Sequence, residues 1–158
     1  MDKVYLETSI ISYLVSKPSK DIILLSHQLI TEDWWGKSRK NYDLYVSVPT
    51  IYEISRGDTE HSEKRLKLVE SLKILDAEEE IKDLINMYMK YYKLPKKFEL
   101  DITHIAYSVY YEMDYLLIWN CKHIANAHFR VQISNFNREK GLHIPEICTP
   151  EELNKKWR

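Results

Sequence analysis

The sequence predicts an α/β fold with a central parallel sheet of about five short strands. Short apolar runs alternate along the chain with longer segments of helical periodicity, which is typical of parallel strands joined by right-handed helical crossovers. The chain has 158 residues, and this length fits a single domain over 1–158. It contains only three glycines and five prolines, which argues against a sandwich of many short strands joined by tight turns.

The first half of the chain contains three expected strands. Thr8 and Ser9 follow the first apolar run and can cap the helix after it. Pro49 stands at a position that favours the first turn of a helix. The expected elements are strands over 4–6, 42–48 and 73–75, and helices over 10–15, from Ser19 or Asp21 to about Arg39, from Pro49 to Arg56, and from Thr59 or Ser62 to Leu72.

The second half of the chain continues the alternation. Acidic residues 78–80 open one helical segment and basic residues lie near its end, as the helix dipole favours. The expected elements are helices over 77–92, from Asp101 to Met113 and from about His123 to Asn135, strands over 115–119 and near Ile144, and a terminal helix capped by Thr149 or Pro150.

Composition restricts the classes of function. The 23 basic and 24 acidic residues are balanced, so a polyanion would have to be bound by a local basic patch. Cys121 and Cys148 lack the spacing of a metal or redox motif and are expected to be reduced thiols. Glu7 interrupts the first apolar run, so we expect no signal peptide. No apolar run approaches about 20 residues, and we expect a cytoplasmic protein without membrane contact.

Four oxygen-bearing side chains stand beside apolar segments. Glu7 and Asn120 follow expected strands, and Glu53 and Asp101 lie in segments that begin helices. Because ligands bind outside the carboxyl ends of parallel strands, we expect these four side chains to converge there as catalytic residues. Carboxylate oxygens suit a hard divalent cation, so Glu7, Glu53 and Asp101 are the expected metal ligands.

Each of these residues also has an ordinary structural explanation. Glu7 could be a carboxylate favoured by a helix dipole, Asp101 a helix N-cap, and Asn120 a turn residue. Glu53 is harder to explain in this way, because residues 51, 52 and 54 around it look buried. The combination of all four residues favours a functional site.

Other polar residues are expected to have smaller roles. His104 and His123 follow Asp101 and Asn120 by three residues and are expected to support the site, although single histidines of this kind usually cap helices or pack in cores. No zinc-type spacing of histidines or cysteines occurs. The lysines expected to contact RNA weakly, which would otherwise be solvated surface residues, are Lys93, Lys96, Lys97 and Lys122.

Four segments together resemble a known family: residues 4–14, 49–54, 101–106 and 115–124. In order and rough spacing they are similar to the PIN-domain ribonucleases, in particular the VapC-type toxins of type II toxin–antitoxin systems. The resemblance implies a three-layer α/β/α domain, an acidic pocket that binds Mg²⁺ or Mn²⁺, single-stranded RNA as substrate and a small antitoxin as partner. It also suggests that Thr8 or Ser9 orients Glu7 or a water molecule on the metal.

The chain departs from the family pattern at two positions. Glu7 stands where the family usually carries aspartate, and the neutral Asn120 stands at a variable acidic position. Since Mg²⁺ demands near-octahedral geometry, the backbone or a bridging water must absorb the extra methylene of Glu7.

The sequence thus predicts a magnesium- or manganese-dependent endoribonuclease in which a metal-activated water attacks the phosphodiester. Two alternatives stay open: a catalytically weakened PIN-like module that binds nucleic acid or a partner, and a phosphoacceptor receiver domain. The receiver domain requires an acidic pair after the first strand, and Asp2 lies too early in the chain for that pair. A second copy of the chain is a further candidate partner.

Overall fold

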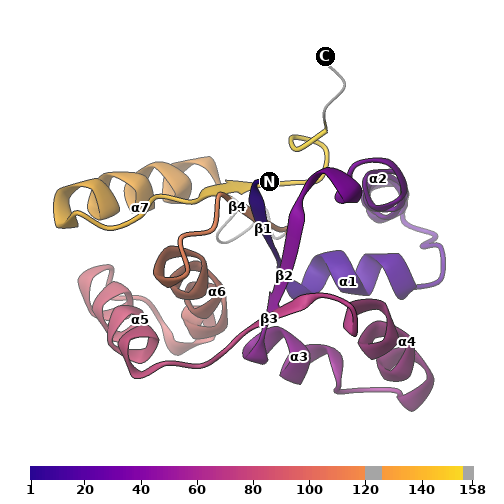
Figure 1. Cartoon of the computed structure of the whole chain (residues 1–158), viewed down its shortest axis with the longest axis horizontal. Coiled ribbons are helices and arrows are strands. Elements are labelled where there is room, and N and C mark those ends of the chain that lie inside the picture. Colours follow the sequence, from indigo (N-terminus) through magenta and orange to yellow (C-terminus); the bar gives the residue numbers. More distant parts are fainter. Residues whose placement is uncertain (120–125, 155–158) are drawn as a thin grey trace.

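The computed structural model describes residues 1–119 and 126–154 and contains one five-stranded parallel sheet (Figure 1). The strand order is β3-β2-β1-β4-β5, and all four neighbouring pairs are parallel. The strands are β1 (Lys3–Leu6), β2 (Asp43–Ser47), β3 (Lys73–Leu75), β4 (Tyr115–Leu117) and β5 (Glu146–Cys148). The α/β class and the expected number of strands are therefore confirmed.

Helices cover both faces of the sheet, which gives the three-layer arrangement that the family resemblance implied. In Figure 1, α1 to α4 lie on one side of the sheet and α5 to α7 on the other. The helices are α1 (Thr8–Val15), α2 (Ile22–Lys37), α3 (Val48–Ile54), α4 (Thr59–Val69), α5 (Glu79–Tyr91), α6 (Glu99–Tyr110) and α7 (Ala127–Lys140), with short 3₁₀ segments η1 (Arg39–Asn41) and η2 (Lys96–Phe98).

Two hydrophobic cores lie on opposite faces of the sheet. Alternate residues of β1 divide between them, because successive side chains of a strand point to opposite faces. Tyr5 belongs to the core beneath α5, α6 and α7, whereas Val4 and Leu6 belong to the core beneath α1, α2 and α4. Trp34, in α2, is fully buried in the second core.

Polar caps define where the helices near the sheet edge begin. Ser47 ends β2 and caps α3, since its hydroxyl accepts the backbone N–H of Thr50 at 3.2 Å. Glu7 caps α1 by accepting the backbone N–H of Ser9 at 2.8 Å. The expectation that Thr8 or Ser9 caps this helix was therefore wrong by one or two residues, and the carboxylate of Glu7 takes that role.

The C-terminal third differs most from expectation. The helix expected over 123–135 is α7, Ala127–Lys140, which starts at the cap Asn126 and ends at Gly141 in the left-handed conformation that glycine favours. The strand expected near Ile144 lies at Glu146–Cys148. The terminal helix expected after Thr149 is only a turn over 150–153 in the described residues.

The strand order reverses between β1 and β4, because the chain moves outward through β2 and β3 on one side and through β4 and β5 on the other. In open α/β sheets such a reversal leaves a crevice at the carboxyl ends of the two central strands, where ligands bind. Glu7 immediately follows β1 and Trp119 lies two residues beyond β4. No helix of the described residues is long and apolar enough to cross a membrane.

Candidate metal centre

Glu7 is held at the carboxyl end of β1 by Ser9. The Glu7 Oε2 atom accepts two hydrogen bonds, one from the backbone N–H of Ser9 at 2.8 Å and a second, very short one from the Ser9 hydroxyl. The Ser9 Oγ atom in turn accepts the backbone N–H of Trp119 at 3.1 Å. Only 8% of Glu7 is exposed. Ser9 therefore orients Glu7 and ties it to the end of β4, one of the two roles that the family resemblance suggested for Thr8 or Ser9.

Glu53 reaches the same edge from α3. It lies near the end of this short helix, whereas the sequence placed it near a helix start. Its Oε1 atom lies 2.8 Å from Nε2 of His104, and 19% of its side chain is exposed. The neighbouring Tyr52 is 64% exposed, so the expectation that it is buried was wrong. Tyr52 and Glu53 point to different sides of α3 because successive helical residues are about 100° apart.

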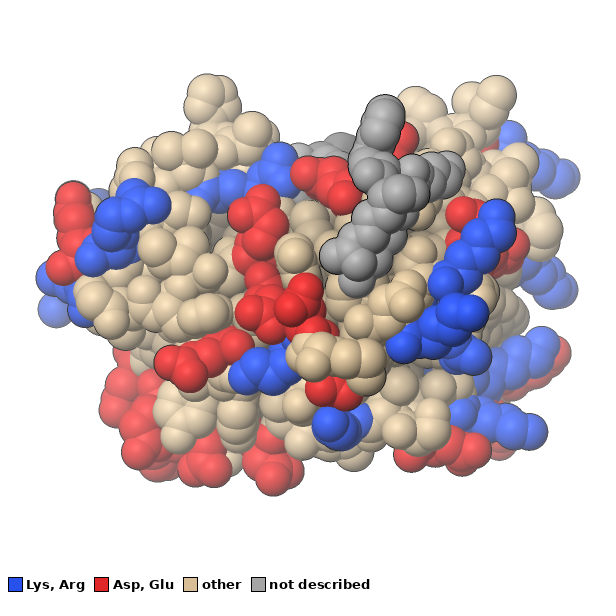
Figure 2. Space-filling model, turned by 45° about the horizontal axis from the view of Figure 1, so that its top comes forward, with Lys and Arg blue, Asp and Glu red and all other residues tan. Residues whose placement is uncertain are grey.

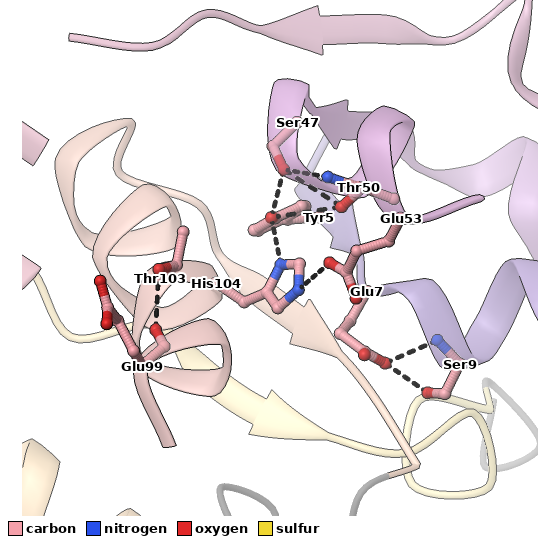
Figure 3. A network of polar contacts seen from close by, with 9 residues as sticks. All are labelled: Tyr5, Glu7, Ser9, Ser47, Thr50, Glu53, Glu99, Thr103 and His104. Atoms are coloured by element: carbon pink, nitrogen blue, oxygen red, sulfur yellow. Dashed lines mark hydrogen bonds and ion pairs between the residues drawn. The ribbon is translucent and has the colours of Figure 1, made fainter. Parts of the chain in front are cut away.

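His104 joins Glu53 to a buried tyrosine. The imidazole is 1% exposed, and its Nδ1 atom lies 2.6 Å from the hydroxyl of Tyr5. Figure 3 shows the ring between Tyr5 and Glu53, with Glu7 beside Glu53 and Ser9 beyond Glu7. Sequence reasoning expected a supporting role for His104 but gave Tyr5 none, because nothing in a strand residue's sequence context reveals its contact with a helix 99 residues away.

The ligand atoms of Glu7, Glu53 and His104 all lie within 4.8 Å of one another. Burial raises the pKa of Glu7 above its ordinary value, against the lowering effects of His104 and of the Ser9 hydrogen bonds. Burial alone would lower the pKa of His104, but the hydrogen bond to Glu53 and the charges of Glu7, Glu53 and Asp101 raise it overall. Both pKa values are therefore raised, but burial favours the neutral form of Glu7, whereas the surrounding carboxylates favour the charged form of His104.

Asp101 lies close to this cluster without being part of it. It is the third residue of α6, whose N-cap position is Phe98, so Asp101 is not the helix cap that the ordinary explanation required. Its side chain is half-buried, one helical turn before His104, and its charge contributes to the raised pKa of His104. Among the described residues, however, the group within 4.8 Å comprises Glu7, Glu53 and His104.

Several expected residues lie elsewhere on the chain. Asn120, Lys122 and His123 fall outside the described residues. The exposed lysines Lys93, Lys96 and Lys97 lie between α5 and α6, just before the helix that carries Asp101 and His104. Figure 2 shows a face on which acidic side chains gather near the middle and basic side chains lie mostly around them.

The residues of the cluster fit a divalent cation. Two carboxylates brought within 4.8 Å of each other repel unless a cation lies between them. In addition, the hydroxyl of Thr8, next to Glu7, is buried and has no hydrogen-bond partner among residues 1–119 and 126–154. An orphaned buried hydroxyl is costly, and a water molecule on a nearby cation is one partner that would satisfy it.

Comparison with known proteins places the fold. No family model matches the chain, and no curated protein matches its sequence. Among solved structures, the VapC20 toxin of Mycobacterium tuberculosis, which cleaves the sarcin–ricin loop, aligns with a TM-score of 0.61 and 10% identity over 78% of this chain and 95% of that chain. VapBC2 of Rickettsia felis, bound to a DNA fragment from its promoter, aligns with a TM-score of 0.58 and 13% identity over 93% of this chain and 98% of that chain.

The fold is that of the VapC toxins. The fold that the family resemblance implied is therefore confirmed. Identities of 10% and 13% establish the fold alone, so the function has to be argued from the site.

Proposed function

We propose that this protein is a divalent-metal-dependent endoribonuclease that cleaves single-stranded RNA and acts as the toxin of a toxin–antitoxin pair. The observation that carries the proposal is the pair of carboxylates formed by buried Glu7, directly after β1, and partly exposed Glu53, on α3, whose oxygens lie within 4.8 Å of each other. The similarity of the fold to VapC20, a toxin that cleaves RNA at the sarcin–ricin loop, supports the same substrate class.

The proposed cofactor is Mg²⁺ or Mn²⁺, held by Glu7, Glu53 and Asp101 with help from Asn120. All of these ligands are oxygens, as hard cations prefer. When bound, such a cation supplies positive charge beside the scissile phosphate and lowers the pKa of coordinated water. Asp101 lies one turn before His104 and therefore on the same side of α6.

The protein's own residues orient the two carboxylates. In the described part of the chain, Ser9 bonds Oε2 of Glu7 and His104 bonds Oε1 of Glu53. This arrangement leaves one oxygen of each carboxylate for a cation. Fixing both side chains before the cation binds reduces the conformational entropy that binding would otherwise remove.

The proposed substrate contacts are electrostatic. Lys93, Lys96 and Lys97 are exposed and precede α6, and lysines in such positions neutralise phosphates and release counterions on binding. Lys122, which follows Asn120 in the sequence, is proposed to act in the same way. RNA bound along these lysines would pass the helix start that carries Asp101.

The proposed partner is a small antitoxin protein, which the similarity to the VapBC2 structure supports. A second copy of the chain is a further proposed partner. A cytoplasmic location is proposed for the pair, since that is where its RNA substrates occur.

The test is cleavage of single-stranded RNA by the full chain with millimolar Mg²⁺ or Mn²⁺ and with chelator. We expect cleavage only with metal, and a loss of at least about a hundredfold in Glu53→Gln. Glu63→Gln is the matched control, because Glu63 is an exposed helical carboxylate on α4, and it should cleave like the parent.

Metal-independent cleavage, or full activity in Glu53→Gln, would refute the proposal. RNA binding without cleavage under every metal condition would instead support the alternative of a catalytically weakened binding module. That alternative is favoured by one observation, the burial that raises the pKa of Glu7 and so disfavours its charged form.

A further inference from the structure

A chain of hydrogen bonds runs from the first turn of α3 back to Glu53 near the end of the same helix. The backbone N–H of Thr50 donates to Ser47 Oγ at 3.2 Å, and Ser47 Oγ lies 2.6 Å from Tyr5 Oη. Tyr5 Oη lies 2.6 Å from Nδ1 of His104, whose Nε2 lies 2.8 Å from Glu53 Oε1. The dashed contacts of Figure 3 trace this path across α3, β1 and α6.

The chemistry of the two ends sets the direction of the hydrogens. An ionised carboxylate only accepts hydrogen bonds, so Nε2 of His104 must carry a hydrogen and donate it to Glu53. In the neutral ring Nδ1 is then an acceptor, and the hydroxyl of Tyr5 donates to it. The oxygen of Tyr5 can accept from the Ser47 hydroxyl, which itself accepts from the backbone. Every donor in the chain therefore has an acceptor.

A second buried tyrosine shows what a purely structural network looks like in this protein. Tyr88 donates to Asn137 Oδ1 at 2.6 Å, and Asn137 Nδ2 donates to the backbone carbonyl of His143 at 2.9 Å. That network begins and ends in the core between α5 and α7. The network from Tyr5 instead ends on a partly exposed carboxylate, which needs no buried partner to be solvated. A contribution to stability alone therefore does not explain why the network from Tyr5 ends on Glu53.

We propose that Tyr5 and His104 are positioning residues that lock Glu53 in its metal-binding orientation. The inference rests on the proposed function, since it assumes that Glu53 binds the cation. Tyr5 fixes the imidazole ring, and Nε2–H of the ring holds Oε1 of Glu53, so the remaining oxygen stays beside Glu7. Partners that orient a ligand in this way typically change metal affinity by 10–100-fold when they are removed.

The first experiment compares Tyr5→Phe with Tyr88→Phe in the full chain. Both substitutions remove a buried hydroxyl that donates a hydrogen bond, and both keep the aromatic ring. Titration calorimetry with MgCl₂ and MnCl₂ should show affinity about tenfold weaker in Tyr5→Phe and unchanged in Tyr88→Phe. Equal affinities in the two variants would overturn the proposal, because the network would then be structural only.

A second pair of variants covers the case in which Tyr5→Phe does not fold. The amide of glutamine reaches the place of Nε2, whereas the amide of asparagine reaches only the place of Nδ1. His104→Gln should therefore bind Mg²⁺ more tightly than His104→Asn, because only the former keeps a donor to Glu53. The reverse order would overturn the proposal. The proposal would also be overturned if the electron-spin spectrum of bound Mn²⁺ showed a directly coordinated nitrogen, since His104 would then be a metal ligand.

A measurement without metal separates this proposal from the proposed function. Long-range ¹H–¹⁵N spectra of the metal-free parent should show a hydrogen on Nε2 of His104 and a hydrogen-bonded, unprotonated Nδ1 in the neutral ring. In Tyr5→Phe the Nδ1 resonance should shift to that of an unbonded nitrogen. A bare Nε2 in the parent would overturn the proposal even if the protein cleaves RNA. Failure of the parent to bind either cation would instead refute the proposed function.

Discussion

Replacing Glu7 by glutamine removes one of the two charges in the carboxylate pair while preserving the shape of the side chain. The amide oxygen can still accept the backbone N–H of Ser9. Two unit charges no more than 4.8 Å apart repel by about 3.5 kcal/mol or more at an effective dielectric constant of about 20. The nearby His104 offsets part of this repulsion, and a weaker Ser9 contact offsets more. We therefore expect metal-free Glu7→Gln to be about 1–2 kcal/mol more stable than the parent.

The size of this effect depends on pH. The pKa of Glu7 is raised in the folded state by burial, so the folded state binds a proton more tightly than the unfolded state. Between the ordinary pKa of 4.5 and the folded value, the stability of the metal-free parent falls as pH rises. The reason is that the folded state binds more protons than the unfolded state in this pH range. The raised pKa of His104 acts in the same direction at higher pH. Glu7→Gln should lack the loss of stability that comes from ionisation of Glu7.

Metal should reverse the order of stabilities. A cation at a hundredfold excess over its dissociation constant stabilises the parent by about 2.7 kcal/mol, and the variant with a broken site gains little. For a chain of this size that gain corresponds to roughly 5–10 °C in melting temperature. Thermal and urea unfolding of both proteins with chelator measures the difference in metal-free stability. The same experiments with Mg²⁺ measure how much the cation stabilises each protein. The reasoning is refuted if Glu7→Gln is less stable than the parent in chelator at neutral pH, or gains as much from Mg²⁺.

Three further substitutions test other parts of the site. Glu7→Asp should retain Mg²⁺-dependent stabilisation and cleavage, because it restores the residue usual in the PIN-domain family. A larger loss of cleavage than in Glu7→Gln would show that the longer side chain is needed. Asp101→Asn should leave the metal-free unfolding free energy nearly unchanged, because asparagine keeps the shape and one acceptor oxygen of the side chain. It should lower cleavage by about a hundredfold, and full activity would remove Asp101 from the site. Ser9→Ala should destabilise the protein by about 1–3 kcal/mol in urea unfolding, because the buried N–H of Trp119 loses its acceptor; an unchanged unfolding midpoint would contradict this.

The sheet and most helices could be predicted from the sequence because their signals are local. The apolar run of β1 is followed by polar residues that end it, and Pro49 marks the first turn of α3. The C-terminal signals were local too but ambiguous. Thr149 and Glu152 form the reciprocal hydrogen bonds of a capping box, yet in the described residues they close only a turn. Gly141, a strong helix-end signal, marks the true end of α7.

The candidate site was only partly predictable, because its geometry depends on contacts between distant segments. The convergence of Glu7 and Glu53 was predicted, although Glu53 lies near the end of α3 and not near its start. The contacts of His104 with Tyr5 and Glu53 join residues 99 and 51 positions apart, and no local pattern specifies which way a helical histidine faces. The capping serine Ser47 was a readable signal before Pro49, but its second role as a partner of Tyr5 was not.

The most direct test of the central claim is a crystal structure of the protein with Mn²⁺, in which anomalous scattering locates the cation. The claim is that Glu7 and Glu53 form a divalent-cation site at the carboxyl ends of β1 and β4. It predicts an anomalous peak in contact with oxygens of both carboxylates, with Nε2 of His104 still bonded to Glu53 rather than to the ion. A peak elsewhere, or none at millimolar Mn²⁺ with both carboxylates well ordered, would contradict it.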